Sequence, residues 1–414
     1  MPGKTSVVVG GVDTHKDVHV AAIVDPTGRI LGTSSFPTTK SGLRQLLAWM
    51  AKTGDVAKVG VEGTGAYGAG LARYLAAEGV EVVEVNRPNR QARRRRGKSD
   101  TVDAEAAARA ALNGEANVVP KTQVGIVEAI RVLRVAFRSA RASRARIANQ
   151  IRDLVLTAPD DLRRFLESME TDKRVVRCSR FRPTGDLADP AEATRVALKS
   201  LARRYEALTE EMAGLHDRLD CLTVQANPEL RGAKGVGTDV AAILLVAAGD
   251  NPERMAGEAG FAALCGSSPV EASSGKIVRH RLNRGGNRQA NHALWRIAMV
   301  RMSCDEETKR YVARRRAEGK SNREIIRCLK RYIAREVYRY LVNPQSVPTG
   351  IELRIRRVAA GLSLREVGEA LGSHMTRVSE LERGVIHNTE LARRYQSWLD
   401  ELEPTAAEPE ALAA

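Results

Sequence analysis

Acidic residues at the ends of two short apolar segments are the clearest chemical feature of the sequence. Asp13 follows the run from Ser6 to Val12, and Glu62 follows Val59-Gly-Val61. Short apolar runs are typical of buried strands, so both carboxylates are expected at strand ends. Asp100 and Asp103 stand three residues apart at the head of an Ala-rich segment, which places them on one face of a helix. Four carboxylates at one point repel one another unless cations bind among them.

Such a cluster predicts phosphoryl-transfer chemistry. Oxygen-only ligands favour hard ions, so Mg²⁺ (or Mn²⁺) is expected. Two ions about 4 Å apart can hold the attacking and leaving oxygens of a phosphodiester. We expect two ions per site, with Asp13 bridging them and with Glu62 and the pair of Asp100 and Asp103 each holding one side. His15 and His19 are four residues apart but fall in a strand–turn region, so a helical zinc motif does not fit.

A second candidate group is a pair of serines in a basic loop. Ser273 and Ser274 precede Gly275, and cations follow at Lys276, Arg279, Arg281, Arg284 and Arg288. A serine in such a loop could be a nucleophile whose alkoxide the cations stabilise. It could equally be one of the many serines found in surface loops.

The elements that must position the acids alternate in type. Strands are predicted at residues 6–13, 18–24, 29–36, 58–61 and 80–85, and helices at 41–51 (with Ser41 as the cap), 66–78 and 104–112. Three strands followed by alternating helices and strands predict a mixed sheet with helices on its faces. This order, with acids on strands one and four and on the last helix, is the ribonuclease H-like (RuvC-like) layout.

A dense run of positive charge lies between the last of these strands and the acidic helix. Seven cations occur in twelve residues, at Arg87, Arg90, Arg93, Arg94, Arg95, Arg96 and Lys98. We predict a loop that contacts nucleic-acid phosphates beside the acids, with salt-sensitive binding. The alternative is an ordinary solvated loop.

The middle of the chain is predicted to be helical. Residues 124–157 and 190–225 read as two long helices, with Pro183 and Pro190 marking the loop between them, and they predict an antiparallel pair or a dimerising coiled coil. From Pro228 onward, Leu230–Gly237 forms a glycine-rich hairpin that either binds phosphate or is a simple tight turn. Helices are predicted at 240–248, 289–303 and 321–341.

A last unit follows the linker Pro344–Thr349. Helices are predicted at 352–360, from a capping box at Ser363 to Gly372, and from Ser373, as the cap, to Gly384, in the pattern of a helix-turn-helix. The residues expected to face a DNA groove are His374, Thr376, Arg377 and Glu380. A small helical docking domain is the alternative. Residues 403–414 are predicted to be a disordered tail.

Composition narrows the class of partner. The chain has 414 residues, enough for two or three domains, and a net charge of +16, which predicts a polyanionic partner such as nucleic acid. There is no run of 18 apolar residues, so no membrane association is expected. Five scattered cysteines predict neither a disulfide framework nor a zinc site. The N-terminus has no signal-peptide pattern, so we expect a cytoplasmic, nucleoid-associated bacterial protein.

Three short stretches resemble the DEDD motifs of insertion-sequence transposases with a RuvC-like domain. They are Gly11-Val-Asp-Thr-His-Lys16, Val61-Glu-Gly-Thr-Gly-Ala-Tyr67 and Lys98-Ser-Asp-Thr-Val-Asp-Ala104. The group includes the pilin-gene invertase and the Streptomyces minicircle transposase. Residues 272–276 and 284–288 resemble that family's C-terminal transposase domain, and the last unit resembles a phage-repressor helix-turn-helix.

The resemblance implies that Asp13, Glu62, Asp100 and Asp103 are the catalytic metal ligands. It also implies a serine that becomes covalently joined to DNA. This is Ser274 or its neighbour Ser273, and Ser274 is favoured because it adjoins Gly275. A dimer or tetramer with shared sites, and recognition of donor and target DNA through a structured bridge RNA, are implied as well.

The expected organisation has five parts. They are a RuvC-like catalytic domain (1–120), a helical or coiled-coil dimerisation region (121–227), a transposase domain with the serine loop (228–343), a helix-turn-helix domain (350–402) and the tail (403–414). The expected function is a DNA recombinase that moves its own insertion sequence. Two alternatives are a RuvC-like nuclease or resolvase that hydrolyses DNA without a covalent intermediate, and a non-catalytic DNA-binding regulator.

Overall fold

The computed structural model describes residues 6–85, 99–275 and 280–402, which form two compact units. The first contains the residues up to Gly125 together with Ala247–Gly285. The second contains Ile126–Val246 and the residues from Gly286 onward. The basic run Arg87–Lys98 and the tail 403–414 lie outside the described residues. In the described ranges, no helix combines the length and the apolar character needed to cross a bilayer.

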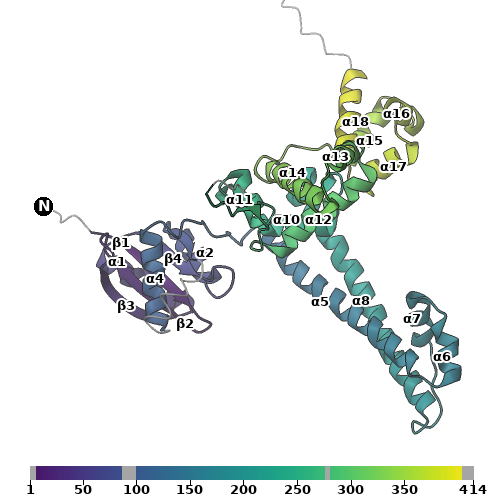
Figure 1. Cartoon of the computed structure of the whole chain (residues 1–414), viewed down its shortest axis with the longest axis horizontal. Helices are drawn as coiled ribbons and strands as arrows, with labels where there is room; N and C mark the ends of the chain where they lie inside the picture. Colours follow the sequence, from purple (N-terminus) through teal and green to yellow (C-terminus); the bar gives the residue numbers. More distant parts are fainter. Residues whose placement is uncertain (1–5, 86–98, 276–279, 403–414) are drawn as a thin grey trace, which may run out of the picture. The chain divides into compact units, whose positions relative to one another are not determined.

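A five-stranded mixed sheet is the centre of the first unit (Figure 1). Its strand order is β3-β2-β1-β4-β5, with β1 antiparallel to β2 and parallel to β4. The strands are β1 (Val7–Thr14), β2 (Val18–Val24), β3 (Ile30–Pro37), β4 (Asp55–Glu62) and β5 (Glu81–Val85), and the helices are α1 (Lys40–Thr53), α2 (Ala69–Ala77) and α4 (Asp100–Leu112). This order of elements confirms the predicted mixed sheet and is consistent with a ribonuclease H-like domain.

The sheet is covered on both faces. Val8 and Val12 of β1 pack with Leu46 of α1 and Leu71 of α2. The opposite face packs against α4, where Val9 and Val83 meet the alanines of that helix. Since side chains alternate along a strand, the odd-numbered residues of β1 point toward α4.

Two glycines allow α4 to lie directly on the strands. A Cβ at Gly11 would be 2.0 Å from the backbone nitrogen of Ala108, and one at Gly60 would be 2.6 Å from the carbonyl oxygen of Ala107. No larger residue fits at either position. The close approach fixes where the first turn of α4 lies relative to the ends of β1 and β4.

Helix α1 begins earlier than predicted. Thr39 is its N-cap and accepts a hydrogen bond from the Gly42 backbone N–H at 3.1 Å, so the prediction that Ser41 caps this helix was wrong. Ser41 is also a good capping type, but Thr39 has the extended backbone that a cap requires.

The rest of the first unit is attached at residues 117–125. Asn251 donates a hydrogen bond to the Pro120 carbonyl and accepts one from the Thr122 N–H, at 3.0 and 3.3 Å. The Gln123 side chain donates to the Thr64 carbonyl, in the loop that follows Glu62, at 3.0 Å. This unit also contains the short helices η1 (Pro252–Arg254) and α11 (Gly257–Leu264) and the two-stranded β6 (Val270–Glu271) and β7 (His280–Arg281), none of which was predicted.

Two long helices dominate the second unit. α5 (Ile126–Leu156) and α8 (Pro190–Ala226) pack along each other, as predicted, and share a core with Ile151 and Leu198. The connection between them contains α6 (Asp160–Glu167) and α7 (Thr171–Ser179), which were not predicted and which precede the loop marked by Pro183 and Pro190. Dimerisation through these helices stays a prediction.

Five further helices follow in this unit. They are α9 (Pro228–Gly232), α10 (Thr238–Ala248), α12 (Arg288–Cys304), α13 (Glu306–Ala317) and α14 (Asn322–Val342). α10, α12 and α14 correspond to predicted helices, whereas α13 was not predicted. Arg134 on α5 is buried and contacts Gln289 and Asp239, and Asp239 also pairs with Arg296 at 2.8 Å, so these ion pairs tie α5 to α10 and α12.

The C-terminal helices are α15 (Gly350–Ala359), α16 (Leu364–Ala370), α17 (Met375–Glu382) and α18 (Thr389–Leu402). The capping box of Ser363 with Glu366 is present as predicted. The cap of α17 is His374 rather than Ser373, because the His374 ring accepts the Thr376 N–H at 3.3 Å. α18 was not predicted as a helix.

These helices are attached to α9 by buried polar contacts. The Glu229 carboxylate accepts hydrogen bonds from Arg393 at 2.9 Å and from the Gln345 N–H at 2.8 Å. A Cβ at Gly232 would lie 2.1 Å from the Thr389 hydroxyl, so α9 and the start of α18 are in close contact.

Candidate active site

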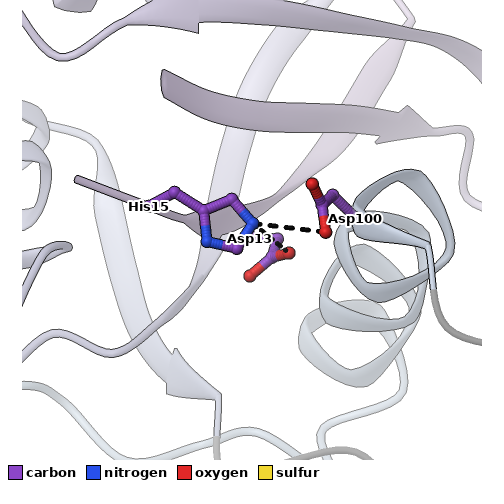
Figure 2. A group of neighbouring side chains, drawn as sticks. All are labelled: Asp13, His15 and Asp100. Carbon is purple, nitrogen blue, oxygen red and sulfur yellow. Dashed lines mark ion pairs between the residues drawn. The ribbon is translucent and has the colours of Figure 1, made fainter. Parts of the chain in front are cut away.

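Asp13, His15 and Asp100 form a cluster at one end of the sheet (Figure 2). His15 Nε2 lies 3.3 Å from Asp13 Oδ2 and 3.3 Å from Asp100 Oδ1. One ligand atom from each of the three residues lies within 4.8 Å of the others. Among the described residues, no other group of three or more His, Cys, Asp or Glu side chains meets this condition. The two aspartates come from segments 87 residues apart, and both are among the four predicted acids.

The fold explains why these two aspartates meet. Asp13 is on the same side of β1 as Gly11, the position where α4 contacts the strand. Asp100 is the first residue of α4, and Ser99 caps the helix by accepting a hydrogen bond from the Val102 N–H. Asp13 is part of β1 and is 7% exposed, so it is more deeply placed than a residue beyond the strand end.

Glu62 and Asp103 lie on the elements that hold the cluster but are not members of it. Val12 of β1 is paired with Val61 of β4, which places Glu62 beside the end of β1. The Thr14 hydroxyl donates to the Glu62 carbonyl at 2.8 Å and links the two strand ends. Asp103 is buried, at 3% exposed, on the stripe of α4 that faces the sheet.

The residues present suit a divalent cation. Asp13 and Asp100 offer carboxylate oxygens whose positions are set by a strand and by a helix start, and His15 offers an imidazole nitrogen. Carboxylate oxygen suits Mg²⁺ and Mn²⁺, while imidazole suits transition metals, so the mixed set fits Mn²⁺ as well as Mg²⁺.

His15 is the site residue that sequence reasoning missed. Its spacing to His19 was considered and set aside, whereas the relevant spacing is to Asp13, two residues earlier. His15 directly follows the end of β1 (Val7–Thr14), so the short spacing to Asp13 was visible in the sequence, but the turn into β2 sets where the ring lies. The His15 N–H also donates to the Val18 carbonyl at 3.2 Å, which closes the β1–β2 turn.

His19 is not a member of this cluster. Its side chain is buried, at 2% exposed, and its Nδ1 atom has no hydrogen-bond partner. Burial, with a smaller contribution from His15, lowers the pKa of His19 below the usual 6.5.

The serine pair lies on an exposed surface. Ser273 and Ser274 follow β6 and are exposed, and Gly275 next to them has a φ of +57°. Glycine adopts this left-handed backbone without the strain that a Cβ brings. Of the predicted cations, Arg281, Arg284 and Arg288 are exposed, whereas Lys276 and Arg279 lie outside the described residues.

The residues proposed to face DNA in the C-terminal helices are accessible. Thr376 and Arg377 are exposed on α17, and Arg377 lies 3.6 Å from Glu380. Four residues separate α16 from α17, as in a helix-turn-helix.

Comparison with known proteins gives two matches to family models. A model described as "Transposase", of the DEDD type found in IS110, matches residues 10–158. A second, described as "Transposase IS116/IS110/IS902 family", matches residues 227–313. The first includes the acids and the second includes the serine loop.

A curated relative comes from Streptomyces coelicolor and is called "Insertion element IS110 uncharacterized 43.6 kDa protein". It is 30% identical over 165 residues, which is 38% of this chain. The aligned part spans 40% of the relative's own length.

Proposed function

From the two IS110-family transposase domains that this chain carries, we propose that the protein is the transposase of an insertion sequence. In this proposal it cuts and joins DNA strands with a divalent-metal site and a serine nucleophile. The observation that carries it is the meeting of Asp13 and Asp100 around His15, inside a region matched by a DEDD transposase model.

The metal ligands in this proposal are Asp13, Glu62, Asp100 and Asp103. Mg²⁺ or Mn²⁺ bound there would polarise the phosphodiester and stabilise the charge that develops on its oxygens. The residues of the chain supply rigidity, since β1, β4 and α4 hold the carboxylates without loop flexibility. The short contacts at Gly11 and Gly60 support this role.

The covalent step is assigned to Ser274, with Ser273 as the second candidate. Its Oγ forms a bond to phosphorus while a P–O bond to a deoxyribose breaks. The serine proton is lost to solvent and the departing sugar oxygen gains one, so the step needs no oxidant or reductant. Attack by a second sugar hydroxyl on the phosphoserine would later release the serine and join the strands. Arg281, Arg284 and Arg288 are exposed nearby in the sequence and suit contact with the phosphates.

Element ends and target DNA are the proposed substrates, with a structured bridge RNA as guide and a homodimer or tetramer as the active form. The net charge of +16 supports a polyanionic partner. The basic residues Arg87–Lys98 are proposed to hold the backbone beside the acids, and Thr376 and Arg377 to contact DNA through α17.

The test is a covalent-adduct assay. The protein is incubated with Mg²⁺, labelled element ends and the flanking transcript, then denatured and run on a gel. We expect joined DNA and a labelled protein band in the wild type, and loss of the band in Ser274→Ala. Ser267→Ala is the matched control, because the Ser267 hydroxyl already donates to the Ala262 carbonyl at 3.0 Å.

Three outcomes separate the alternatives. Loss of the band in Ser273→Ala but not in Ser274→Ala moves the nucleophile to the neighbour. Cleavage without any protein-linked DNA indicates hydrolysis by a nuclease and refutes the serine mechanism. Unchanged cleavage in Asp13→Asn and Asp100→Asn refutes the assignment of cleavage to this metal site.

A further inference from the structure

Two tyrosines on neighbouring helices form an aromatic pair at the surface of the second unit. Tyr311 of α13 and Tyr332 of α14 have ring centres 5.7 Å apart and meet edge to face at 83°. Tyr332 is 54% exposed, although tyrosine side chains with so much apolar area are usually better covered. The guanidinium carbon of Arg314 lies 5.4 Å from the centre of the Tyr311 ring. Rings combined with arginines are the means by which proteins stack single-stranded bases.

A cavity of about 390 Å³ lies beside this pair. Tyr311, Tyr332 and Arg314 form part of its wall, and Arg301 and Glu336 also line it. Those two are joined by hydrogen bonds of 2.6 and 2.8 Å, so their charges are already paired with each other. The volume is in the range of pockets that hold small organic ligands (roughly 300–1,000 Å³).

The polar groups of the wall suit a nucleobase better than a phosphate. Asp305 and Glu307 also line the cavity and offer carboxylate oxygens. Although burial alone would raise it, hydrogen bonds from Lys234 and Thr308 lower the pKa of Asp305 to about 2, so this acid is ionised at neutral pH. Carboxylates accept hydrogen bonds from the amino groups of bases and repel phosphates.

The charge around the cavity favours a nucleic acid. Residues 305–342 contain twelve Lys or Arg against six Asp or Glu. Arg314, Arg323 and Arg327 are exposed on these two helices and can contact the backbone on either side of a bound nucleotide. The match to the second transposase model ends at residue 313, so Tyr332 and most of these cations lie beyond it.

We propose that α13 and α14 (Figure 1) bind an unpaired nucleotide of a single-stranded nucleic acid. The base stacks on Tyr332 and enters the cavity, where Asp305 and Glu307 accept hydrogen bonds from its N–H groups, and Arg314 contacts the adjacent phosphate. The inference depends on the proposed function only in that the ligand is a nucleic acid, since this site requires no metal.

The experiment measures binding by fluorescence anisotropy with the full chain in EDTA, where strand cleavage cannot occur. The probes are single-stranded DNA, single-stranded RNA of the same sequence, and duplex DNA. Stacking contributes about 1–3 kcal/mol per base, so we expect Tyr332→Ala to weaken single-strand binding by about 5- to 150-fold. Tyr332→Phe keeps the ring and should bind within about twofold of wild type, and duplex binding should not change.

Phe165 provides a matched control. It is 42% exposed on α6, and the guanidinium carbon of Arg177 lies 4.9 Å from its ring centre, but it lines none of the described cavities. Phe165→Ala should leave single-strand binding unchanged. Tyr332→Leu, which keeps apolar contacts but cannot stack, should lose binding as Tyr332→Ala does, and this guards against a folding defect.

The inference is overturned if Phe165→Ala weakens single-strand binding as much as Tyr332→Ala does. It is also overturned if Tyr332→Phe weakens that binding as much as Tyr332→Ala does. Equal losses for single-stranded and duplex probes would overturn it as well. Equal affinity for DNA and RNA supports recognition of the base alone, and stronger RNA binding adds a contact to the 2′-hydroxyl. Asp13→Asn should bind single strands as the wild type does, whatever its effect on cleavage. Binding at this site can therefore be tested separately from the proposed transposase activity.

Discussion

Replacing Gly11 with alanine tests whether α4 positions the metal ligands. The new Cβ would lie 2.0 Å from the Ala108 nitrogen and 2.4 Å from the Ala104 carbonyl oxygen. Both atoms belong to the backbone of α4, so no side-chain rotation relieves the contact. Contacts between a Cβ and other heavy atoms are essentially never below 3.0 Å, so the helix must move away from β1 by about 1 Å or more.

The displacement has two separable consequences. Overpacking of this kind lowers the free energy of unfolding by about 1–3 kcal/mol, which denaturant titration measures. Asp100 and Asp103 move with the helix while Asp13 stays on β1. A misplacement of about 1 Å can reduce a rate by about 100-fold. We therefore expect Gly11→Ala to lose Mg²⁺-dependent cleavage and to bind Mn²⁺ more weakly, as followed by electron paramagnetic resonance, at temperatures where it is folded.

Two other glycines of the same unit serve as controls. A Cβ at Gly10 would meet the end of the flexible Met50 side chain at 2.8 Å, on the opposite face of β1, so Gly10→Ala should cost less and should spare metal binding. A Cβ at Gly70 in α2 meets nothing within 4 Å, so Gly70→Ala should stabilise the protein by up to about 1 kcal/mol. If Gly11→Ala and Gly10→Ala have the same stability and the same metal affinity, the reasoning about α4 is wrong.

Three further predictions concern stability. Thr39→Ala should lower the free energy of unfolding by about 1 kcal/mol and Ser41→Ala by much less, because Thr39 caps α1; urea titration of both variants checks this. Glu229→Ala should speed limited proteolysis near residues 343–349, because it leaves Arg393 and the Gln345 N–H without their carboxylate partner. Glu352→Ala is the control, because it removes only an exposed capping contact. Because burial lowers the pKa of His19, the unfolded chain takes up a proton before the folded one as the pH falls below about 6.5. Stability should therefore be full above that pH and decline below it, and His19→Gln should flatten this decline in unfolding curves recorded from pH 7.5 to 5.

Elements with strong local signals could be predicted from the sequence, and those set by tertiary contacts could not. The strands, the two long helices and the Ser363 capping box carry their own periodicity or caps. In contrast, α6 and α7 are amphipathic but only eight and nine residues long, which is too short for a helical period to be recognised, and α13 is highly charged with only Val312 buried. The choice between Thr39 and Ser41, or between His374 and Ser373, depends on which residue the neighbouring chain holds extended, and composition does not encode this.

The acids could be predicted because a strand end and a helix start are local features of the sequence. Which of the acids lie close to one another depends on the fold. Asp13 and Asp100 meet because Gly11 lets the helix rest on the strand, and a glycine in a strand interior is by itself only a weak signal.

His15 shows what the fold adds to the chemistry. From the sequence, four oxygen donors alone predict a site for hard ions. With His15 Nε2 at 3.3 Å from both carboxylates, an entering cation either displaces the imidazole from those oxygens or gains it as a nitrogen ligand. In the first case the histidine holds the carboxylates in place before the metal arrives, and in the second it shifts the preference from Mg²⁺ toward Mn²⁺. Both follow from a spacing of two residues, which places His15 directly after the end of β1 and beside the acid that the site depends on.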